Sequence, residues 1–363
     1  MAEAHAATHH PGPGWRHALL LACALFALHE VLGIVVALLD HHHPLDTCHW
    51  DCHWYVSIAQ HGYAKVISPS THQADWAFFP LFPLLLRATV AVTGLAAPLA
   101  AVLLGKAIFL AAIAGFIVFA RAWMPAVSPW HAAIVIALEP YAVYGDAGYT
   151  EPLFLLLTCL FFIALRTRRY LLCGACGALL SATRVPGILV ALPYALALAG
   201  RFAQADARER WAIALGGLLI PLGLALYMLH LDRVTGDALA FAHVQTAWRR
   251  APTDPLSAVW GGLRAGNIHA LWALLSLFGV AGGLWLLWTG QVALGAFALA
   301  CTLLPLSAGL MSMPRYLAWQ APLLLVLAWL LRRRWLRWTL IPLGIAGLAY
   351  MQIGWLAARA WTV

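Results

Sequence analysis

The residues of this chain that could do chemistry lie in a few polar stretches between long apolar runs. Residues 50–63 are the most polar and aromatic of these, and they contain the carboxylate of Asp51. Glu151, Arg184 and Arg315 come from three other parts of the chain. A carboxylate can act as a general base, and a guanidinium can bind a phosphate through paired hydrogen bonds. Together these residue types predict group transfer from an anionic donor.

The composition places these residues in a membrane protein. Of the 363 residues, 63% are hydrophobic and 10% are charged, whereas soluble domains are about 45–50% apolar. Apolar runs of about 20 residues recur along the chain, and as helices each would cross a hydrocarbon core about 30 Å thick. The runs are continuous, which favours helices over a barrel. We therefore expect an all-α polytopic membrane protein with about 11 transmembrane helices.

The charge pattern indicates how the chain is oriented. A net charge of +8 could suggest nucleic acid, but the basic residues occur in short bursts between apolar runs, so we expect no nucleic-acid partner and cytoplasmic loops at the bursts. The bursts are Arg166, Arg168 and Arg169; Arg201, Arg208 and Arg210; and Arg332, Arg333, Arg334 and Arg337. Residues 40–75 hold four Asp and one Lys, Lys65, so this interval is predicted to lie outside the cytoplasm.

The first part of the chain predicts a tail, an anchor and an external helix. We expect residues 1–14 to be a disordered cytoplasmic tail and residues 15–363 a single domain, with external loops at about 40–77 and 231–267. The first crossing is predicted at 15–39, followed by a short amphipathic helix at 51–61 along the membrane surface. Trp54, Ile58 and His61 would share one face of that helix, and Gly62 would end it.

The later crossings are less regular. The loop before residues 78–122 is predicted to be external and the turn near Arg121 cytoplasmic, so this interval must cross the membrane an odd number of times. Its length, however, suggests two helices. Two arrangements stay open: one crossing helix with a re-entrant segment, or three short helices. Residues 170–200 are predicted to form a hairpin broken at 184–187, where Pro186 and Gly187 interrupt the helix. Phe241 to Trp248 suggests a surface helix. Further crossings are expected near residues 130–144, 152–166, 211–230, 268–289, 291–310, 316–331 and 338–358.

Cysteines and histidines suggest metal or redox chemistry without requiring it. Cys48 and Cys52 lie on the predicted oxidising side, where a disulfide is allowed. Cys173 and Cys176 have redox spacing, but their apolar helical setting favours packing, and Cys23, Cys159 and Cys301 are expected to be buried. Metal binding by His41, His49 and His53 is possible but not favoured, and no cofactor is expected.

The charges of Asp51, Glu151, Arg184 and Arg315 are predicted to meet at the external surface of the membrane. Such a site suits an amphiphilic substrate, and a polyprenyl-phosphate sugar has both a phosphate and a lipid tail. Arg184 and Arg315 are the expected phosphate ligands, and Asp51 is the expected base. The side chains expected to bind substrate are His53, Trp54, Tyr55, Tyr63, Phe79, Tyr149, Glu151 and Tyr316.

Five motifs in order carry a resemblance to a known family. They are Trp50-Asp51 with Tyr55, Ile58-Ala59 and Gly62-Tyr63; Phe78-Phe79-Pro80-Leu81-Phe82-Pro83; Tyr149-Thr150-Glu151-Pro152-Leu153-Phe154; Arg184-Val185-Pro186-Gly187; and Pro314-Arg315-Tyr316. Over about residues 16–331 the chain resembles the PIG-V type mannosyltransferases. These enzymes add the second mannose in GPI-anchor synthesis and have bacterial relatives, within the GT-C membrane glycosyltransferases.

The resemblance implies a GT-C-like bundle and an inverting transfer of mannose from a polyprenyl-phosphate donor to a glycolipid or other hydroxyl acceptor on the outer face. By position, Asp51 corresponds to the catalytic carboxylate of the external loop. Two departures are a cysteine, Cys52, where many relatives have a small polar residue, and the lack of an Asp-x-Asp loop. The short, Ala-rich chain suggests a bacterial inner membrane, with the N-terminus in the cytoplasm.

Each candidate residue also has a structural alternative. Asp51 could cap the helix that it begins, and Glu151 could interact with the dipole of its helix. Arg184 and Arg315 could extend along the apolar surface toward the membrane interface. The aromatic candidates could serve packing alone.

A second class of function stays open. His29, Glu30, Glu139 and Asp146 are predicted inside the membrane, where ionisable residues often line a transport pathway. The chain could then be a transporter or a lipid flippase. The absence of a visible internal repeat counts against this alternative.

Overall fold

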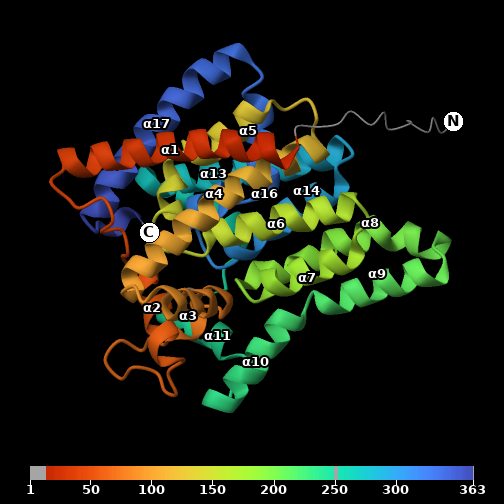
Figure 1. Cartoon of the computed structure of the whole chain (residues 1–363), viewed down its shortest axis with the longest axis horizontal. Helices are drawn as coiled ribbons and strands as arrows, with labels where there is room; N and C mark the ends of the chain where they lie inside the picture. Colours follow the sequence, from red (N-terminus) through yellow and green to blue (C-terminus); the bar gives the residue numbers. More distant parts are fainter. Residues whose placement is uncertain (1–13, 249–251, 363) are drawn as a thin grey trace.

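A computed structural model describes residues 14–248 and 252–362, and these residues contain helices and no strands. The proposed tail at residues 1–14 therefore lies outside the described residues except for Gly14. The helices run mostly alongside one another, with α1, α4 and α6 in a row and α7, α8 and α9 beside them (Figure 1). Their bounds are α1 Trp15–Leu39, α4 Ala97–Trp123, α6 Glu151–Arg166, α7 Tyr170–Ser181, α8 Ala191–Gln204 and α9 Ala207–Leu219.

Within the described residues, six helical segments are long and apolar enough to cross a membrane, which confirms the polytopic helical class. These are α1, α4, α8 with the 3₁₀ turn η3 Val185–Val190, α9 with α10 Leu222–Thr235, α13 Asn267–Trp288 and α17 Arg334–Leu356. Shorter apolar helices are α3 Leu81–Thr93, α7, α14 Val292–Leu306 and α16 Ala321–Leu330. Large apolar side chains such as Leu39, Trp211 and Trp288 point outward, as expected of surfaces that face lipid.

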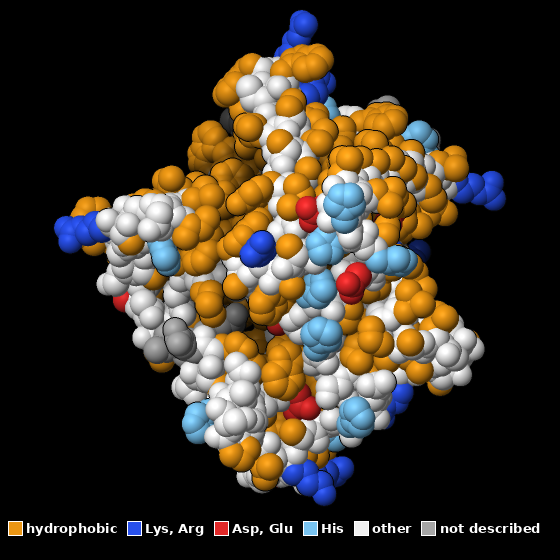
Figure 2. All heavy atoms as spheres, turned by 90° about the vertical axis from the view of Figure 1, so that its left-hand side faces the viewer, with side chains coloured by type: hydrophobic (Ala, Val, Ile, Leu, Met, Phe, Trp, Pro, Cys, Tyr) orange, Lys and Arg blue, Asp and Glu red, His pale blue; other side chains and the backbone are white. Residues whose placement is uncertain are grey.

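The remaining elements are short. They are α2 Asp51–His61, α5 Pro129–Ala137, α11 Ala240–His243, α12 Pro255–Ala265 and α15 Met313–Ala318, with 3₁₀ turns η1 Asp75–Ala77, η2 Pro140–Gly145, η4 Val244–Trp248 and η5 Ala360–Thr362. Helices α2, α3 and α11 lie together at one end of the bundle (Figure 1). Histidine side chains gather near the middle of the face in Figure 2. His41 and His43, which precede α2, and His53 in its first turn are exposed.

Two predicted helices have the predicted bounds. The structure confirms the first crossing as α1 and the 51–61 helix as α2, which ends at Gly62 with φ of 79°. The predicted face of α2 is wrong, because the buried residues are Cys52, Tyr55, Val56, Ile58 and Ala59 while His61 is exposed. The reason is that α2 packs against α3 and α4.

The interval 78–122 contains two helices, α3 and α4. Only α4 is long enough to cross, since at about 1.5 Å per residue the 13 residues of α3 span about 20 Å. Helix α3 packs against α2 and α4 at the end of the bundle (Figure 1). This arrangement favours one crossing helix with a non-spanning segment before it.

Several predicted crossings are interrupted. The helix expected at 130–144 ends at Ala137, because Pro140 favours an extended conformation at Glu139, whose ψ is 158°. The helix expected at 211–230 begins at Ala207, breaks at Pro221 and continues to Thr235. The 316–331 helix is divided between α15 and α16, and α12 lies within the loop expected at 231–267.

The predicted break at 184–187 is confirmed. Helix α7 ends at Ser181 and η3 begins at Val185, so Arg184 lies on extended backbone between them. A Cβ on Gly187 would lie 2.0 Å from the carbonyl oxygen of Leu180, so this close approach requires glycine. The break thereby places Arg184 at the end of α7, beside α6.

Candidate active site

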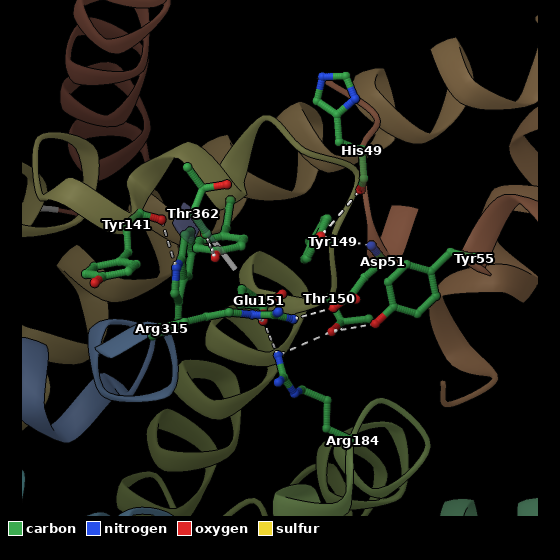
Figure 3. Close-up of polar contacts among 12 residues, drawn as sticks. His49, Asp51, Tyr55, Tyr141, Tyr149, Thr150, Glu151, Arg184, Arg315 and Thr362 are labelled. Carbon is green, nitrogen blue, oxygen red and sulfur yellow. Dashed lines mark hydrogen bonds and ion pairs between the residues drawn. The ribbon is translucent and has the colours of Figure 1, made fainter. Parts of the chain in front are cut away.

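Four charged side chains meet at the N-terminal end of α6. We call Asp51, Glu151, Arg184 and Arg315 the Asp51 cluster. Arg315 donates from Nη2 to Asp51 Oδ2 at 2.9 Å and from Nε to Glu151 Oε1 at 2.5 Å. Arg184 Nη1 donates to the same Oε1 atom. Figure 3 shows the two arginines converging on Glu151.

Local backbone features bring the two carboxylates together. Trp50, which precedes α2, has φ of 52°, an uncommon value for a residue other than glycine. Gly148 has φ of 69°, and a Cβ there would lie 2.9 Å from the sulfur of Cys52. The segment that carries Glu151 therefore packs directly beneath α2, which begins at Asp51.

Tyrosine and threonine side chains fix the two segments to each other. The Asp51 backbone N–H donates to the Tyr149 hydroxyl at 2.9 Å, and that hydroxyl faces the His49 carbonyl at 3.4 Å. Tyr55 and Thr150 hydroxyls lie 3.3 Å apart, and Arg184 Nη1 lies 3.5 Å from Thr150 Oγ1. Figure 3 shows Tyr55 pointing toward Thr150. These contacts hold the carboxylates in place.

Aromatic rings enclose the guanidinium groups. The Cζ atom of Arg315 lies 4.9 Å from the Tyr144 ring centre and 4.8 Å from that of Tyr149, and Arg184 lies 5.2 Å from the Tyr316 ring. Such cation–π contacts stabilise cations that are removed from water. Arg315 is buried, so the alternative that it extends toward the membrane interface is wrong.

The carboxylates differ in exposure. The side chain of Glu151 is 1% exposed, whereas that of Asp51 is 22% exposed. Trp50 occupies the N-cap position and the Asp51 carboxylate binds Arg315, so the capping alternative for Asp51 is wrong. Among the described residues, Asp51 Oδ1 has no hydrogen-bond partner. Asp51 is therefore the carboxylate that an incoming molecule can reach.

A cavity adjoins the cluster on the side of Arg184. The space open to the centre of a water molecule is about 30 Å³, so in this conformation the cavity is a narrow cleft that admits small polar groups. Its lining residues are Glu151, Phe154, Arg184, Pro186, Cys301, Pro305, Arg315, Tyr316, Trp319 and Gln320. Asp51 is not part of the lining, but its partner Arg315 is.

Some of the other residues predicted to bind substrate lie at the Asp51 cluster or its cavity, and the rest lie elsewhere. Tyr149 and Tyr55 support the Asp51 cluster, and Tyr316 lines the cavity. Trp54 stacks on Phe78 with ring centres 5.5 Å apart, and Trp248 packs against both rings. His53 is exposed on the outer side of α2.

Tyr63 and Phe79 belong to a separate aromatic group that closes the external loop. Phe79 packs against Tyr227 and Phe241, and the Tyr63 hydroxyl donates to the Phe78 carbonyl at 2.7 Å. Below them, burial raises the pKa of the Asp75 carboxyl, which accepts from the Ala64 N–H. The structure gives both aromatic residues packing contacts, as their alternative predicted.

The cysteines and histidines also have clear positions. Cys48 and Cys52 form a disulfide, whereas Cys173 and Cys176 are buried free thiols and Cys23 is exposed, contrary to expectation. Cys23 is exposed because it lies on an outward face of α1. In the described part of the chain, no three His, Cys, Asp or Glu side chains gather in a way that could hold a metal ion. Burial lowers the pKa of the His49 imidazole, which keeps it neutral at neutral pH.

A second group of charges surrounds Asp146, at the other end of the 146–151 segment from Glu151. We call His29, Glu30, Lys106 and Asp146 the Asp146 cluster. Lys106 Nζ lies 2.7 Å from Glu30 and 3.0 Å from Asp146, and His29 Nε2 lies 2.8 Å from Asp146. Glu139, the fourth residue of the transport alternative, binds the Tyr141 N–H instead.

Sequence reasoning missed several residues of these clusters. Thr150 belongs to one of the five motifs, but nothing in the sequence indicated that its hydroxyl would contact Tyr55 and Arg184. Tyr144 and Gln320 lie in apolar surroundings and come close to Arg315 only through the fold. Lys106 did carry a signal, because a lone cation in a long apolar helix usually has a buried partner.

A comparison with known families supports the motif resemblance. The family described as Mannosyltransferase (PIG-V) matches residues 31–176. No curated protein and no solved structure matches the chain. The matched part contains Asp51, Tyr149 and Glu151, whereas Arg184 and Arg315 lie beyond it. Residues 31–176 thus carry the signature of the PIG-V type mannosyltransferases, and the resemblance that the motifs indicated is confirmed there.

Proposed function

We propose that this membrane glycosyltransferase moves mannose from a polyprenyl-phosphate donor to a hydroxyl group of a glycolipid or other acceptor. The observation that carries the proposal is the Asp51 cluster itself. It joins a reachable carboxylate to two arginines beside a cavity, and its members come from four separate parts of the chain.

Asp51 would act as the general base in a single displacement. Its free Oδ1 atom would accept the proton of the acceptor hydroxyl while that oxygen attacks the anomeric carbon. The bond from this carbon to the phosphate oxygen would break at the same time, and its electron pair would leave with the polyprenyl phosphate. The transfer would therefore invert the configuration of the anomeric carbon.

The arginines would stabilise the departing phosphate. Arg184 is the better placed, because its side chain is 18% exposed and its Nε and Nη2 atoms have no hydrogen-bond partner in the described ranges. Arg315 binds the carboxylates of Asp51 and Glu151 and would add a second positive charge near the phosphate. Preformed donors of this kind stabilise charge that develops in a transition state. The apolar side chains of Phe154, Pro186 and Pro305 suit the first units of the lipid tail.

The charge pattern supports an external active site. Glu151 begins α6, and the basic burst at Arg166, Arg168 and Arg169 follows its other end. The 16 residues of α6 span about 24 Å, close to the thickness of the hydrocarbon core. With the basic end in the cytoplasm, as the positive-inside rule predicts, the Asp51 cluster would face outward. The proposal also places the N-terminus in the cytoplasm and the protein in the inner membrane of a bacterium.

The test compares Asp51→Asn with Asp46→Asn in purified protein. With labelled polyprenyl-phosphate mannose and extracted membrane lipids, we expect Asp51→Asn to lower transfer by roughly 10²–10⁴-fold, the usual contribution of a general base. Asp46 is exposed in the same loop, so its variant should transfer label at the wild-type rate. Equal activity of the two variants would rule out Asp51 as the base.

A further inference from the structure

Two residues that line the cavity beside Arg184, Glu151 and Gln320, each carry a buried oxygen atom that lacks a hydrogen-bond donor. Glu151 Oε2 has no partner because both arginines bind Oε1, and Gln320 Oε1 has none either, among the residues that the structure describes. The two residues are 1% and 3% exposed. Buried polar atoms are nearly always paired in native proteins, so two unpaired acceptors in one cavity call for an explanation.

None of the described side chains around the cavity donates to either of these two oxygens in the structure. Gln320 Nε2 donates to Thr302 Oγ1 at 3.4 Å, and this contact leaves Oε1 as the unpaired end of the amide. The indole N–H of Trp319 is used by the Tyr141 carbonyl. Arg315 is used by the two carboxylates. A molecule that entered this cavity would therefore be favoured if it brought hydroxyl donors.

We propose that Glu151 and Gln320 form a hydroxyl-binding subsite for the hexose of the donor, which makes Gln320 a specificity-determining residue. This inference rests on the proposed function. A hexose carries several hydroxyl donors, whereas the phosphate and the lipid tail carry none. The subsite adjoins Arg184, so a sugar bound there would have its phosphate next to a guanidinium with unpaired N–H groups.

The first experiment measures binding of two lipids to the purified protein. One is polyprenyl-phosphate mannose and the other is polyprenyl phosphate without a sugar. We expect the wild-type protein to prefer the mannose lipid, and Gln320→Met to weaken binding of that lipid about tenfold, the effect of one lost hydrogen bond of about 1.4 kcal/mol. Affinity for the bare lipid should stay the same. Gln320→Glu keeps an acceptor and should keep the preference.

Gln352 provides a matched control. It is 4% exposed and its Oε1 atom is also unpaired, but it lines a different cavity beside the Asp146 cluster. Gln352→Met should bind both lipids as the wild type does. Wild-type affinity of Gln320→Met for the mannose lipid would overturn the inference, and so would an equal loss of both lipids.

A second measurement works even if Gln320→Met does not fold. Mannose lipids that each lack one hydroxyl group are compared for binding to the wild-type protein. At least one of them should bind about tenfold more weakly, because a site built around a hydroxyl rejects the analogue without it. Equal binding of all of them would overturn the subsite and leave the proposed function standing. Failure of the wild-type protein to bind either phosphate lipid would instead refute the proposed function.

Discussion

The two buried charge clusters contain the two ends of the 146–151 segment, Asp146 and Glu151, and they are built differently. In the Asp146 cluster, Lys106 contacts two carboxylates, and each oxygen of Asp146 lies within 3.0 Å of Lys106 or His29, although Oδ1 makes no aligned hydrogen bond. His29 Nδ1 faces the Ala137 carbonyl at 2.8 Å, which can only accept, so this nitrogen carries a hydrogen. In the Asp51 cluster, by contrast, two arginines share one oxygen of Glu151, and other polar atoms remain without partners.

This difference indicates different roles. The Asp146 cluster joins α1, α4 and the 146–151 segment, and its Asp146 carbonyl also accepts from Thr47 at 2.5 Å. Every charged group of this cluster faces a group of opposite charge or an imidazole, and such pairing suits a structural support, since buried charges are stable only when paired. Both clusters adjoin a cavity, but in the Asp51 cluster both arginines bind the same Glu151 oxygen and the other oxygen has no donor among the described residues, an arrangement that costs stability in the empty protein and suits ligand binding. The comparison predicts losses of stability at one cluster and losses of activity at the other.

The largest effect is expected for Lys106→Met. Loss of the ammonium leaves the carboxylates of Glu30 and Asp146 without their cation, and breaking a buried ion pair in this way typically costs about 3–5 kcal/mol. Thermal unfolding in detergent should show the loss. Transfer activity of the molecules that remain folded should stay close to the wild-type value.

The matched control for this variant neutralises the unpaired carboxylates. Adding Glu30→Gln and Asp146→Asn to Lys106→Met should restore part of the stability, because no uncompensated charge then remains buried. A Lys106→Met protein with wild-type stability and no transfer would contradict the assigned roles. Loss of ion or lipid transport in a stable Asp146→Asn variant would instead favour the transport alternative.

A smaller effect, on activity alone, is expected for Arg184→Gln. The variant removes the best-placed donor for the departing phosphate, so the turnover number should fall by about 100-fold, which corresponds to about 2.7 kcal/mol. Glu151 keeps Arg315 as its partner, and the unfolding temperature should change little. Arg201→Gln is the control, since Arg201 on α8 pairs with Glu209 on α9 and its loss should affect neither quantity. A large drop in stability with normal turnover would reverse the roles of the clusters.

The sequence predicted the membrane class and the helices whose ends have local signals. Helix α1 is one uninterrupted apolar run, and α2 lies between Trp50 and the stop at Gly62, so both have the predicted bounds. The irregular crossings were harder to predict. Pro140 and Pro322 mark the bend at Leu138–Glu139 and the start of α16, but each lies in an apolar stretch long enough to suggest an unbroken crossing.

The sequence indicated that the charged candidates lie together, but not which aromatic candidates lie beside them. Asp51, Glu151, Arg184 and Arg315 are costly to bury singly, so their presence in an apolar chain indicated that they meet. An aromatic ring is equally stable in a core, and nothing local distinguished Tyr149 at the site from Phe79 in the packed group. Gln320 was missed for a similar reason, since its unpaired oxygen is a property of the fold.

The smallest effect is expected for Thr47→Val, which tests whether the two clusters are independent. The Thr47 hydroxyl donates to the Asp146 carbonyl, and Thr47 lies four residues before Asp51, so it connects the Asp146 cluster to the segment that leads to Asp51. Its loss leaves the carbonyl without this donor and should cost about 1 kcal/mol of stability. Asp51 has its own contacts to Arg315 and Tyr149, so turnover should stay within about twofold of the wild type.

The control for Thr47→Val is Thr167→Val. The Thr167 hydroxyl only bonds back to its own helix at an exposed position, so its loss should change stability by no more than about 0.5 kcal/mol. A tenfold fall in the turnover of Thr47→Val, at unchanged stability, would mean that Asp146 helps to position Asp51. The two clusters would then act as one unit, and the separation of support from catalysis would have to be abandoned. Independent clusters require the opposite result, a small loss of stability with normal turnover.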